Sequence, residues 1–282
     1  MRMTMGSKQQ RPISLGLQVC AALGAVCALA GSVCAQGISL DMGGATLKME
    51  PESAQEELAV GRLVAGQILG AAKLLPNAEL QRYVNLVGRR VADQSERKDA
   101  AWAFGVIDSS AINAFAGPGG KILITSALLQ ILESEDELAA VLAHEVAHVV
   151  RKHHYRVIRK QRMLEFGAQS VAIKEDSSGM SEKLSGMVAQ VLARGLDQSA
   201  EFEADRDGMV YAARAGYDAS ALIRVMEKLS AVSAKDPAGE LLLSTHPSAE
   251  NRRITMAKQV NADLEKAATP SRSAARYRQF VK

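Results

Sequence analysis

The chain has 282 residues, of which 48% are apolar and 23% are charged, so it can bury a core and is not disordered by composition. Aromatic residues make up only 4%, which argues against a surface that stacks nucleobases or sugars. The formal net charge is +3, but residues 1–35 hold three basic side chains and no acidic one. The remaining 31 of the 34 basic residues balance the 31 acidic residues. The rest of the chain is therefore neutral, which argues against nucleic acid as the main partner.

The N-terminal segment has the layout of a secretory signal peptide. A basic start precedes an apolar core over residues 19–29, and small side chains at Val33 and Ala35 suit cleavage before Gln36. The apolar core is short for a membrane span. We therefore expect residues 1–35 to be a signal peptide and the mature protein to be periplasmic; the alternative is an anchor formed by this segment if it is not cleaved.

The cysteines support no chemistry in the mature protein. All three of them, Cys20, Cys27 and Cys34, fall inside the expected signal peptide. The mature chain would therefore have neither a disulfide nor a thiol nucleophile. This excludes cysteine-protease chemistry and metal sites built on cysteine, and it leaves stability to the hydrophobic core.

The first part of the mature chain reads as helical. Residues 36–50 form a glycine-rich lead-in, residues 52–74 show helical periodicity, and a second helix follows Pro76 over residues 77–94. We take residues 36–75 as an N-terminal lead-in and helix that precede the main domain.

Strand patterns replace the helical period over residues 102–125. Residues 102–108 predict one strand, and residues 112–116 and 121–125 predict a hairpin around the turn at 117–120, which has the sequence Gly-Pro-Gly-Gly. The main domain is therefore expected to hold a small β-hairpin sheet.

Helical patterns resume after the hairpin. A capping box of Ser134 and Glu137 opens a helix that is predicted to run unbroken over residues 135–166. Three more helical segments are expected at about residues 201–216, 219–232 and 248–266. The result is one α+β domain, mostly helical, over residues 76–266, followed by a flexible tail over residues 267–282.

A His-Glu-x-x-His motif formed by His144, Glu145 and His148 lies in the middle of the expected long helix. Residues four apart on a helix face the same side, so the two imidazoles can bind one metal ion. Neutral imidazoles suit Zn²⁺, and the intervening glutamate can reach a water molecule at an open coordination position. The alternative is a pair of ordinary helix histidines, but apolar neighbours indicate a buried helix, where an uncompensated His-Glu-His cluster would be costly.

His154 is the first candidate for a third metal ligand, because it follows His148 by six residues as in metzincins. Those proteins need a glycine three residues after the second histidine, and Arg151 stands there. An unbroken helix through Lys160 would carry His154 about 9 Å along the axis and roughly 240° around it. We therefore expect His153 and His154 on a solvated basic face, away from the metal.

Glu201 is the better candidate for the third ligand. It shares a helix face with Asp205, one turn later, whereas Glu203 points about 160° away and should be solvated. Ala204 is small and lets this helix approach the metal-binding helix closely. Asp205 would orient a metal ligand or the reacting groups. The alternative for Asp205 is an ordinary carboxylate on a helix surface, paired with a nearby arginine.

The chain presents its motifs in one order, with His144-Glu-Val-Ala-His148 followed by Glu201-x-x-Ala-Asp205 and then by His246-Pro247 with Arg252. Asn113-Ala-Phe-Ala116 precedes them, and Ala215-Gly-Tyr-Asp218 follows the acidic helix. This set resembles the M48 metallopeptidases, a family with bacterial outer-membrane-assembly proteases and mitochondrial members. The resemblance covers about residues 76–254.

The resemblance implies a zincin-like metalloprotease domain of the gluzincin type, which is α+β and mostly helical. His144, His148 and Glu201 would be the ligands of one Zn²⁺ per chain, and Glu145 would be the general base and later the proton donor. Gln198 departs from the family pattern, which often has arginine there. Without a helical-repeat extension or a bundle of membrane spans, the chain resembles a short, exported member.

His246 is placed near the metal by the resemblance, and three roles stay open for it. It would stabilise the tetrahedral intermediate, or occupy the fourth zinc position and hold the enzyme latent, or serve only as a structural residue before Pro247. The catalytic set expected from the resemblance is therefore Glu145, Asp205 and His246.

The substrate is expected to add itself to the edge strand formed by Asn113, Ala114, Phe115 and Ala116, where main-chain pairing tolerates many sequences. This suits a metalloendopeptidase that degrades misfolded or stalled envelope proteins in periplasmic quality control. Its partners would be unfolded or misassembled envelope proteins, with peripheral membrane association left open. The alternatives are an envelope chaperone or assembly factor that binds unfolded outer-membrane proteins with little proteolysis, and an integral membrane protease if the N-terminal segment is retained.

Overall fold

The computed structural model describes most of the chain between Ser53 and Gln259 and a C-terminal helix. The described residues are 39–41, 46–48, 53–98, 100–166, 186, 188–233, 242, 244–246, 249–259 and 273–281. The expected signal peptide therefore lies outside them. Within these ranges, none of the helices combines the length and the hydropathy of a membrane span.

The chain divides into two units, residues 1–52 and residues 53–282. In the first unit, strands β1 (Ser39–Asp41) and β2 (Thr46–Lys48) pair in antiparallel fashion. The glycine-rich lead-in expected at residues 36–50 therefore includes a short two-stranded ladder. Everything that concerns the metal site belongs to the second unit.

The sheet of the second unit has three strands in the order β3-β5-β4, with bounds Ala103–Ile107 for β3, Lys121–Thr125 for β5 and Ala114–Gly117 for β4. The predicted hairpin is β4 and β5, which pair in antiparallel fashion. Gly119 and Gly120 in its turn have φ angles of 69° and 91°, which glycine adopts without strain. β3 pairs in parallel with β5, and this leaves β4 at one edge of the described sheet.

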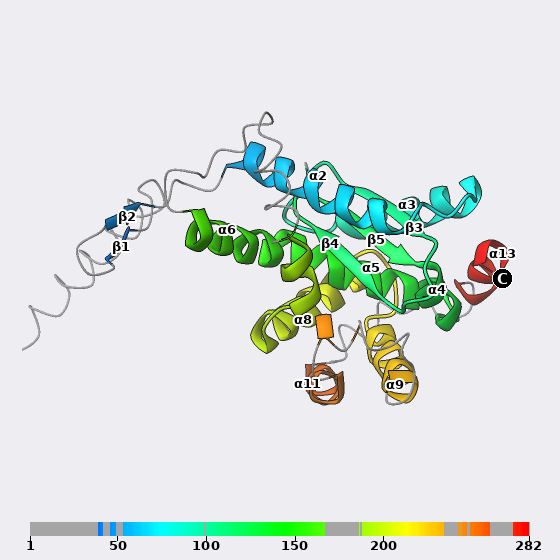
Figure 1. Ribbon diagram of the computed structural model, residues 1–282. Coiled ribbons are helices and arrows are strands. Elements are labelled where there is room, and N and C mark those ends of the chain that lie inside the picture. The colour runs from blue at the N-terminus through cyan, green and yellow to red at the C-terminus, as the bar shows by residue number, and fades with distance from the viewer. Residues whose placement is uncertain are drawn as a thin grey trace, which may run out of the picture. The chain divides into compact units, whose positions relative to one another are not determined.

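Four helices surround this sheet, and each begins at a residue whose side chain accepts a backbone N–H. They are α2 (Ala54–Ala71), α3 (Ala78–Ala92), α4 (Ser126–Ile131) and α5 (Glu135–Val150). Figure 1 shows α2 above the strands and α5 below them. α5 is buried along almost its whole length, so the His-Glu-x-x-His motif lies inside the main core.

Further helices follow along the chain: α6 (His153–Phe166), α8 (Gln198–Arg214), α9 (Ala221–Ser233), α11 (Ala249–Gln259) and α13 (Ser273–Val281). α8 packs along α5, and a Cβ atom added at Gly208 would lie 3.0 Å from the backbone nitrogen of His144. Together with the fully buried Ala204, this glycine brings the two helices close enough for their polar side chains to meet. The fold is thus α+β and mostly helical with a small sheet, as the sequence predicts.

The helix predicted to run unbroken over residues 135–166 is interrupted, and that prediction is wrong. α5 ends at Val150, Lys152 has a φ angle of 58°, and α6 begins at His153. Arg97 donates a hydrogen bond to the carbonyl of Val149, and Lys152 Nζ lies 3.6 Å from the buried carboxylate of Glu57. Tertiary contacts thus hold a turn in a segment that has no glycine or proline.

The C-terminal segment also differs from the expectation of a flexible tail over residues 267–282. Residues 267–272 lie outside the described part, but residues 273–281 form α13, whose Tyr277 is fully buried. Phe280, one turn later, stacks on Tyr83 with ring centroids 4.4 Å apart. Two aromatic rings on one helix face anchor this segment to the core.

Candidate metal centre

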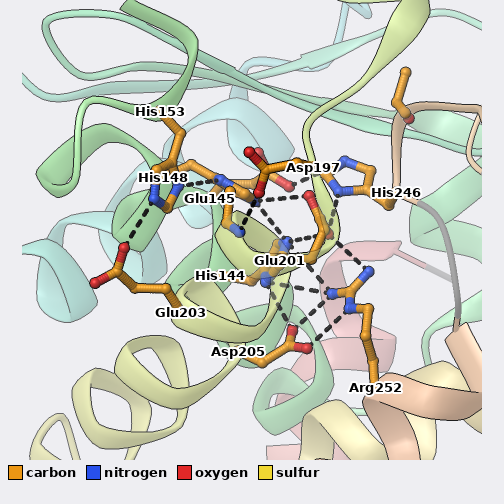
Figure 2. A network of polar contacts seen from close by, with 12 residues as sticks. His144, Glu145, His148, His153, Asp197, Glu201, Glu203, Asp205, His246 and Arg252 are labelled. Atoms are coloured by element: carbon orange, nitrogen blue, oxygen red, sulfur yellow. Dashed lines mark hydrogen bonds and ion pairs between the residues drawn. The ribbon is translucent and has the colours of Figure 1, made fainter. Parts of the chain in front are cut away.

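Four elements bring their polar side chains to one point beneath the sheet (Figure 2). α5 supplies His144, Glu145 and His148, and α8 supplies Glu201 and Asp205. The segment 244–246 supplies His246, and α11 supplies Arg252. Ligand atoms of His144, His148, Glu201 and His246 all lie within 4.8 Å of one another, and all four residues are buried.

The two imidazoles of the motif turn the same nitrogen toward each other. The Nε2 atoms of His144 and His148 are 2.9 Å apart. The Nδ1 atom of His144 lies 3.0 Å from Asp205 Oδ1, so the proton of a neutral ring belongs on Nδ1 and leaves Nε2 with its lone pair. Two lone pairs at this separation repel each other unless a cation lies between them.

Glu201 completes the set of donors. Its Oε2 lies 3.5 Å from His144 Nε2 and its Oε1 lies 3.4 Å from His148 Nε2. Oε1 finds no hydrogen-bond partner among the described residues. Two neutral imidazoles and one carboxylate, all buried and directed at one point, match the donor set that binds Zn²⁺ in catalytic sites.

The ionisation of the site also favours a cation. Burial disfavours the charged form of His144, but hydrogen bonds to Asp205 and Glu201 outweigh it and raise the pKa to about 9. Burial and the neighbouring His144 hold the pKa of His148 well below its usual value. Burial would raise the pKa of Glu201, but His246, His148 and His144 hold it well below its usual value. The carboxylates thus attract one positive charge, which a metal ion can supply in place of a proton.

Glu145 is the buried acid of the site. Burial raises its pKa, against the effect of the nearby His246 and His144. Its Oε1 lies 3.9 Å from His246 Nε2, and its Oε2 has no hydrogen-bond partner in the described part of the chain. A carboxylate with a raised pKa and a free oxygen beside the donor set is suited to accept and return a proton.

Asp205 and Arg252 form a buried pair behind His144. Arg252 donates from Nη2 to Asp205 Oδ1 at 2.6 Å and from Nε to Oδ2 at 2.8 Å, and its Nη1 lies 2.9 Å from Glu201 Oε2. The sequence presents Arg252 only as part of a motif and assigns it no role. Its contacts show that one guanidinium balances the carboxylates of Glu201 and Asp205, and this role depends on the packing of α11 against α8.

His246 lies against the donor set. Its Nδ1 is 3.0 Å from Glu201 Oε2, and its ring centroid is 5.4 Å from that of His144. The structure therefore brings the four candidates His144, His148, Glu201 and His246 together, with Glu145 and Asp205 in contact with them.

The expectation of a solvated basic face for His153 and His154 is wrong. The break at Lys152 turns both rings toward His148, with His153 Nδ1 2.9 Å from His148 Nδ1 and the His154 ring centroid 5.5 Å from that of His148. His154 is nevertheless outside the group of four that could hold a metal. Glu203, which was expected to be solvated, lies 3.2 Å from His153 Nε2 and keeps only part of its side chain exposed.

The expected substrate strand lies next to this centre. β4 begins at Ala114, and the buried Asn113 just before it accepts a hydrogen bond on Oδ1 from the Thr245 hydroxyl at 3.3 Å. Asn113 Nδ2 is buried without a hydrogen-bond partner in the ranges that the structure describes. An apolar pocket adjoins Glu145 and is also lined by His246 and Arg252. Its apolar side chains come from β4, α4, α5 and α9 and from residue 242: Ala114, Leu128, Val141, Leu222, Val225, Met226, Leu229 and Leu242.

Comparison with known proteins adds a family to this geometry. The model of peptidase family M48 matches residues 78–260. The beta-barrel assembly-enhancing protease of Yersinia pestis is 31% identical over 218 residues, which cover 74% of this chain and 44% of that protein. The corresponding protease of Escherichia coli strain K12 is 31% identical over 236 residues, which cover 78% of this chain and 47% of that protein.

A mitochondrial protein is also similar. The mitochondrial metalloendopeptidase OMA1 of Schizosaccharomyces pombe is 33% identical over 171 residues, which cover 60% of this chain and 50% of that protein. The chain thus spans about half the length of each of these curated relatives. The matched region contains all the residues that converge in the metal centre.

Proposed function

The chain belongs to peptidase family M48, and on that premise we propose that it is a zinc-dependent endopeptidase that degrades misfolded or stalled proteins of the cell envelope. One observation carries the proposal. The buried donors of His144, His148 and Glu201 converge on one point, and the free carboxylate oxygen of Glu145 lies beside them. Stability alone would not favour such a cluster, because each of these groups loses hydration on burial.

Each residue has a role in the proposed hydrolysis. Zinc held by His144, His148 and Glu201 would polarise the scissile carbonyl and lower the pKa of a water molecule. Glu145 takes a proton from the attacking water and returns it to the leaving amine, and its raised pKa is consistent with this role. Asp205 holds His144 in the tautomer that turns Nε2 toward the metal.

His246 would restrain the activity. Its position beside Glu201 and Glu145 lets it approach the metal as a fourth ligand, which would displace the water and close the site. His246→Ala should then keep its zinc and raise the turnover of casein. Loss of turnover in this variant, by about 2.7–4 kcal/mol of barrier, would instead indicate that His246 stabilises the oxyanion.

The substrate would bind as an added strand along β4, which lies at the edge of the described sheet. Asn113 supports this placement, because its buried Nδ2 is a donor that a substrate carbonyl could accept from. Phe115 and Ala116 continue the strand, and the apolar pocket beside Glu145 would receive an apolar side chain next to the scissile bond. Main-chain pairing of this kind reads little sequence and suits unfolded substrates.

The biological setting rests on the relatives and on the N-terminal pattern. Two of the relatives are named as beta-barrel assembly-enhancing proteases, which supports envelope proteins as substrates and the periplasm as the location. We propose residues 1–35 as a cleaved signal peptide and residues 76–266 as the peptidase domain. N-terminal sequencing of the mature protein tests the first of these, and an intact N-terminus would favour an anchor.

The enzymatic proposal is tested by comparing the wild type with Glu145→Gln, which keeps the size of the side chain and removes the base. We expect wild type with zinc to fragment casein and an unfolded outer-membrane protein, and Glu145→Gln to bind zinc and leave both intact. Equal fragment patterns from the two proteins would contradict the proposal. Binding of the unfolded protein without cleavage by either would favour the chaperone or assembly factor.

A further inference from the structure

His148 makes a separate contact with each of its two ring nitrogens. Its Nε2 faces the donor set, 2.9 Å from His144 Nε2. Its Nδ1 faces the other way and lies 2.9 Å from Nδ1 of His153, whose Nε2 in turn lies 3.2 Å from Glu203 Oε2. Figure 2 shows this chain of contacts running from the metal centre through His153 to Glu203.

Only one arrangement of protons satisfies all these contacts when a metal is bound. A metal uses the lone pair on Nε2 of His148, so the ring proton must be on Nδ1 and must be donated. His153 can accept it only on an unprotonated Nδ1, which places the proton of His153 on Nε2. That proton is then donated to the carboxylate of Glu203, which can only accept.

The backbone is shaped to make this contact. On an unbroken helix, a residue five positions after His148 would lie roughly 140° around the axis from it. The turn between α5 and α6, with Lys152 at a φ angle of 58°, instead brings His153 back against His148. A non-glycine residue in the left-handed region is uncommon, and here Glu57 and the ring of Tyr155 hold its side chain, with Nζ at 3.6 Å and 5.7 Å.

Glu203 is held in place by two other side chains. Its Oε1 lies 3.6 Å from Arg151 Nε and 3.5 Å from Arg206 Nη2, which leaves Oε2 to His153. The side chain of Glu203 is 36% exposed, so the chain of contacts begins at the buried ligand and ends at the protein surface.

We propose that His153 and Glu203 are positioning residues of the metal centre, which hold His148 in the tautomer and ring orientation that metal binding requires. The proposal rests on the proposed function only in taking His144, His148 and Glu201 as the metal ligands. Partners of this kind set the basicity and orientation of a metal-bound histidine, and their removal typically lowers metal affinity 10- to 100-fold.

Two substitutions at one position separate positioning from packing. In His153→Asn, the side-chain oxygen can take the place of Nδ1 and accept the proton of His148, whereas His153→Leu has a similar size and accepts nothing. We expect zinc affinity, measured by competition with a chromogenic chelator, to fall about 10- to 100-fold in His153→Leu. In His153→Asn it should recover most of that loss.

Matched controls use neighbouring residues. His154→Leu makes the same change at the adjacent histidine, which is outside the group of four, and should keep the zinc affinity of the wild type. Glu203→Gln keeps an acceptor and should stay near the wild type, whereas Glu203→Ala should lose affinity to a smaller extent than His153→Leu. Because Glu203 lies at the surface, its variants keep the test valid if His153→Leu does not fold.

NMR of the ring nitrogens gives a second measurement, because it reports which nitrogen of each histidine carries the proton. ¹⁵N resonances of the zinc-loaded protein should report His148 protonated on Nδ1 and His153 on Nε2, and the His153 pattern should change in Glu203→Ala. Unchanged affinity in His153→Leu, or equal losses in His153→Leu and His153→Asn, would overturn the proposal. A wild type that binds zinc but cleaves nothing would refute the proposed function. The affinity measurements would still test the roles of His153 and Glu203.

Discussion

The two histidine ligands of α5 are supported in opposite ways. His144 is backed by Asp205 and Arg252, whose side chains are 2% and 1% exposed. His148 is backed by His153 and by Glu203, whose carboxylate is partly open to water. In both arrangements Nε2 of the histidine faces the other donors, but one arrangement is sealed in the core and the other opens to solvent.

This difference indicates where the loss of a charged partner should destabilise the protein most. Removing one member of a buried ion pair leaves the other without compensation, which typically costs about 3–5 kcal/mol. At the surface, water replaces a lost partner, and pairs typically contribute about 0.2–1 kcal/mol. The His144 side should therefore govern stability as well as metal binding, and the His148 side should govern metal binding alone.

The largest effect is expected from Arg252→Met. This change leaves the buried carboxylates of Asp205 and Glu201 without their cation and should lower the free energy of unfolding by about 3–5 kcal/mol. Denaturant unfolding of the metal-free protein measures it. Arg253→Met, at the next position on α11, removes only partly exposed ion pairs and should lower the free energy of unfolding by no more than about 1 kcal/mol. Equal effects at the two positions would contradict the contrast.

The next effect concerns pH. In the metal-free protein the pKa of His144 is raised to about 9, so the stability that its proton supplies is present below the unfolded value of 6.5 and is lost as pH rises through 9. The loss should be on the order of 3 kcal/mol between these values. Zinc replaces the proton, so unfolding of the zinc-loaded protein should lack this dependence. A flat profile without metal would mean that Asp205 and Glu201 do not share a charge with His144.

A matched pair of amides compares the two sides directly. Asp205→Asn and Glu203→Gln each keep an acceptor and remove a charge. Asp205→Asn should lower zinc affinity about 10- to 100-fold, because it also leaves Arg252 poorly balanced in the core, whereas Glu203→Gln should change it less than about 3-fold. Chelator competition measures both, and a larger loss in Glu203→Gln would reverse our comparison.

The smallest effect is expected at the turn that creates the exposed side. Lys152→Gly removes the Cβ atom that disfavours a φ angle of 58°, and Lys152→Ala keeps it while removing the same contacts of the long side chain. The glycine variant should therefore be more stable than the alanine variant by about 1 kcal/mol. Unfolding curves compare them; if alanine is as stable as glycine, the turn carries no backbone strain.

Much of the metal centre could be predicted because its motifs are local. The spacing of His144 and His148 and that of Glu201 and Asp205 place each pair on one face of a helix, which follows from helical geometry alone. The hairpin was predictable for the same reason, since Gly-Pro-Gly-Gly in its turn and the flanking apolar residues act within a few positions of each other. The approach of α8 to α5 was anticipated from one small residue, Ala204.

Other features depend on residues far apart in the chain. The parallel pairing of β3 with β5 and the burial of α13 have no local signal. The role of Arg252 exists only because α11 packs on α8, and it joins carboxylates that lie about 50 residues earlier. Such contacts depend on how whole helices and strands pack against one another. The hydrophobic periodicity of a single segment does not predict that arrangement.

The turn at Lys152 shows most clearly how local sequence preference and tertiary contacts differ. The residues from Arg151 to Lys160 favour an uninterrupted helix, and local preference alone predicts one. The carboxylate of Glu57 and the guanidinium of Arg97, both distant in sequence, hold the turn instead. The sequence by itself determined which candidate residues share a helix face, His144 with His148 and Glu201 with Asp205, because helical period is a local property. Only the tertiary structure decided which residues support them, because a strained turn persists only where distant contacts outweigh the local preference.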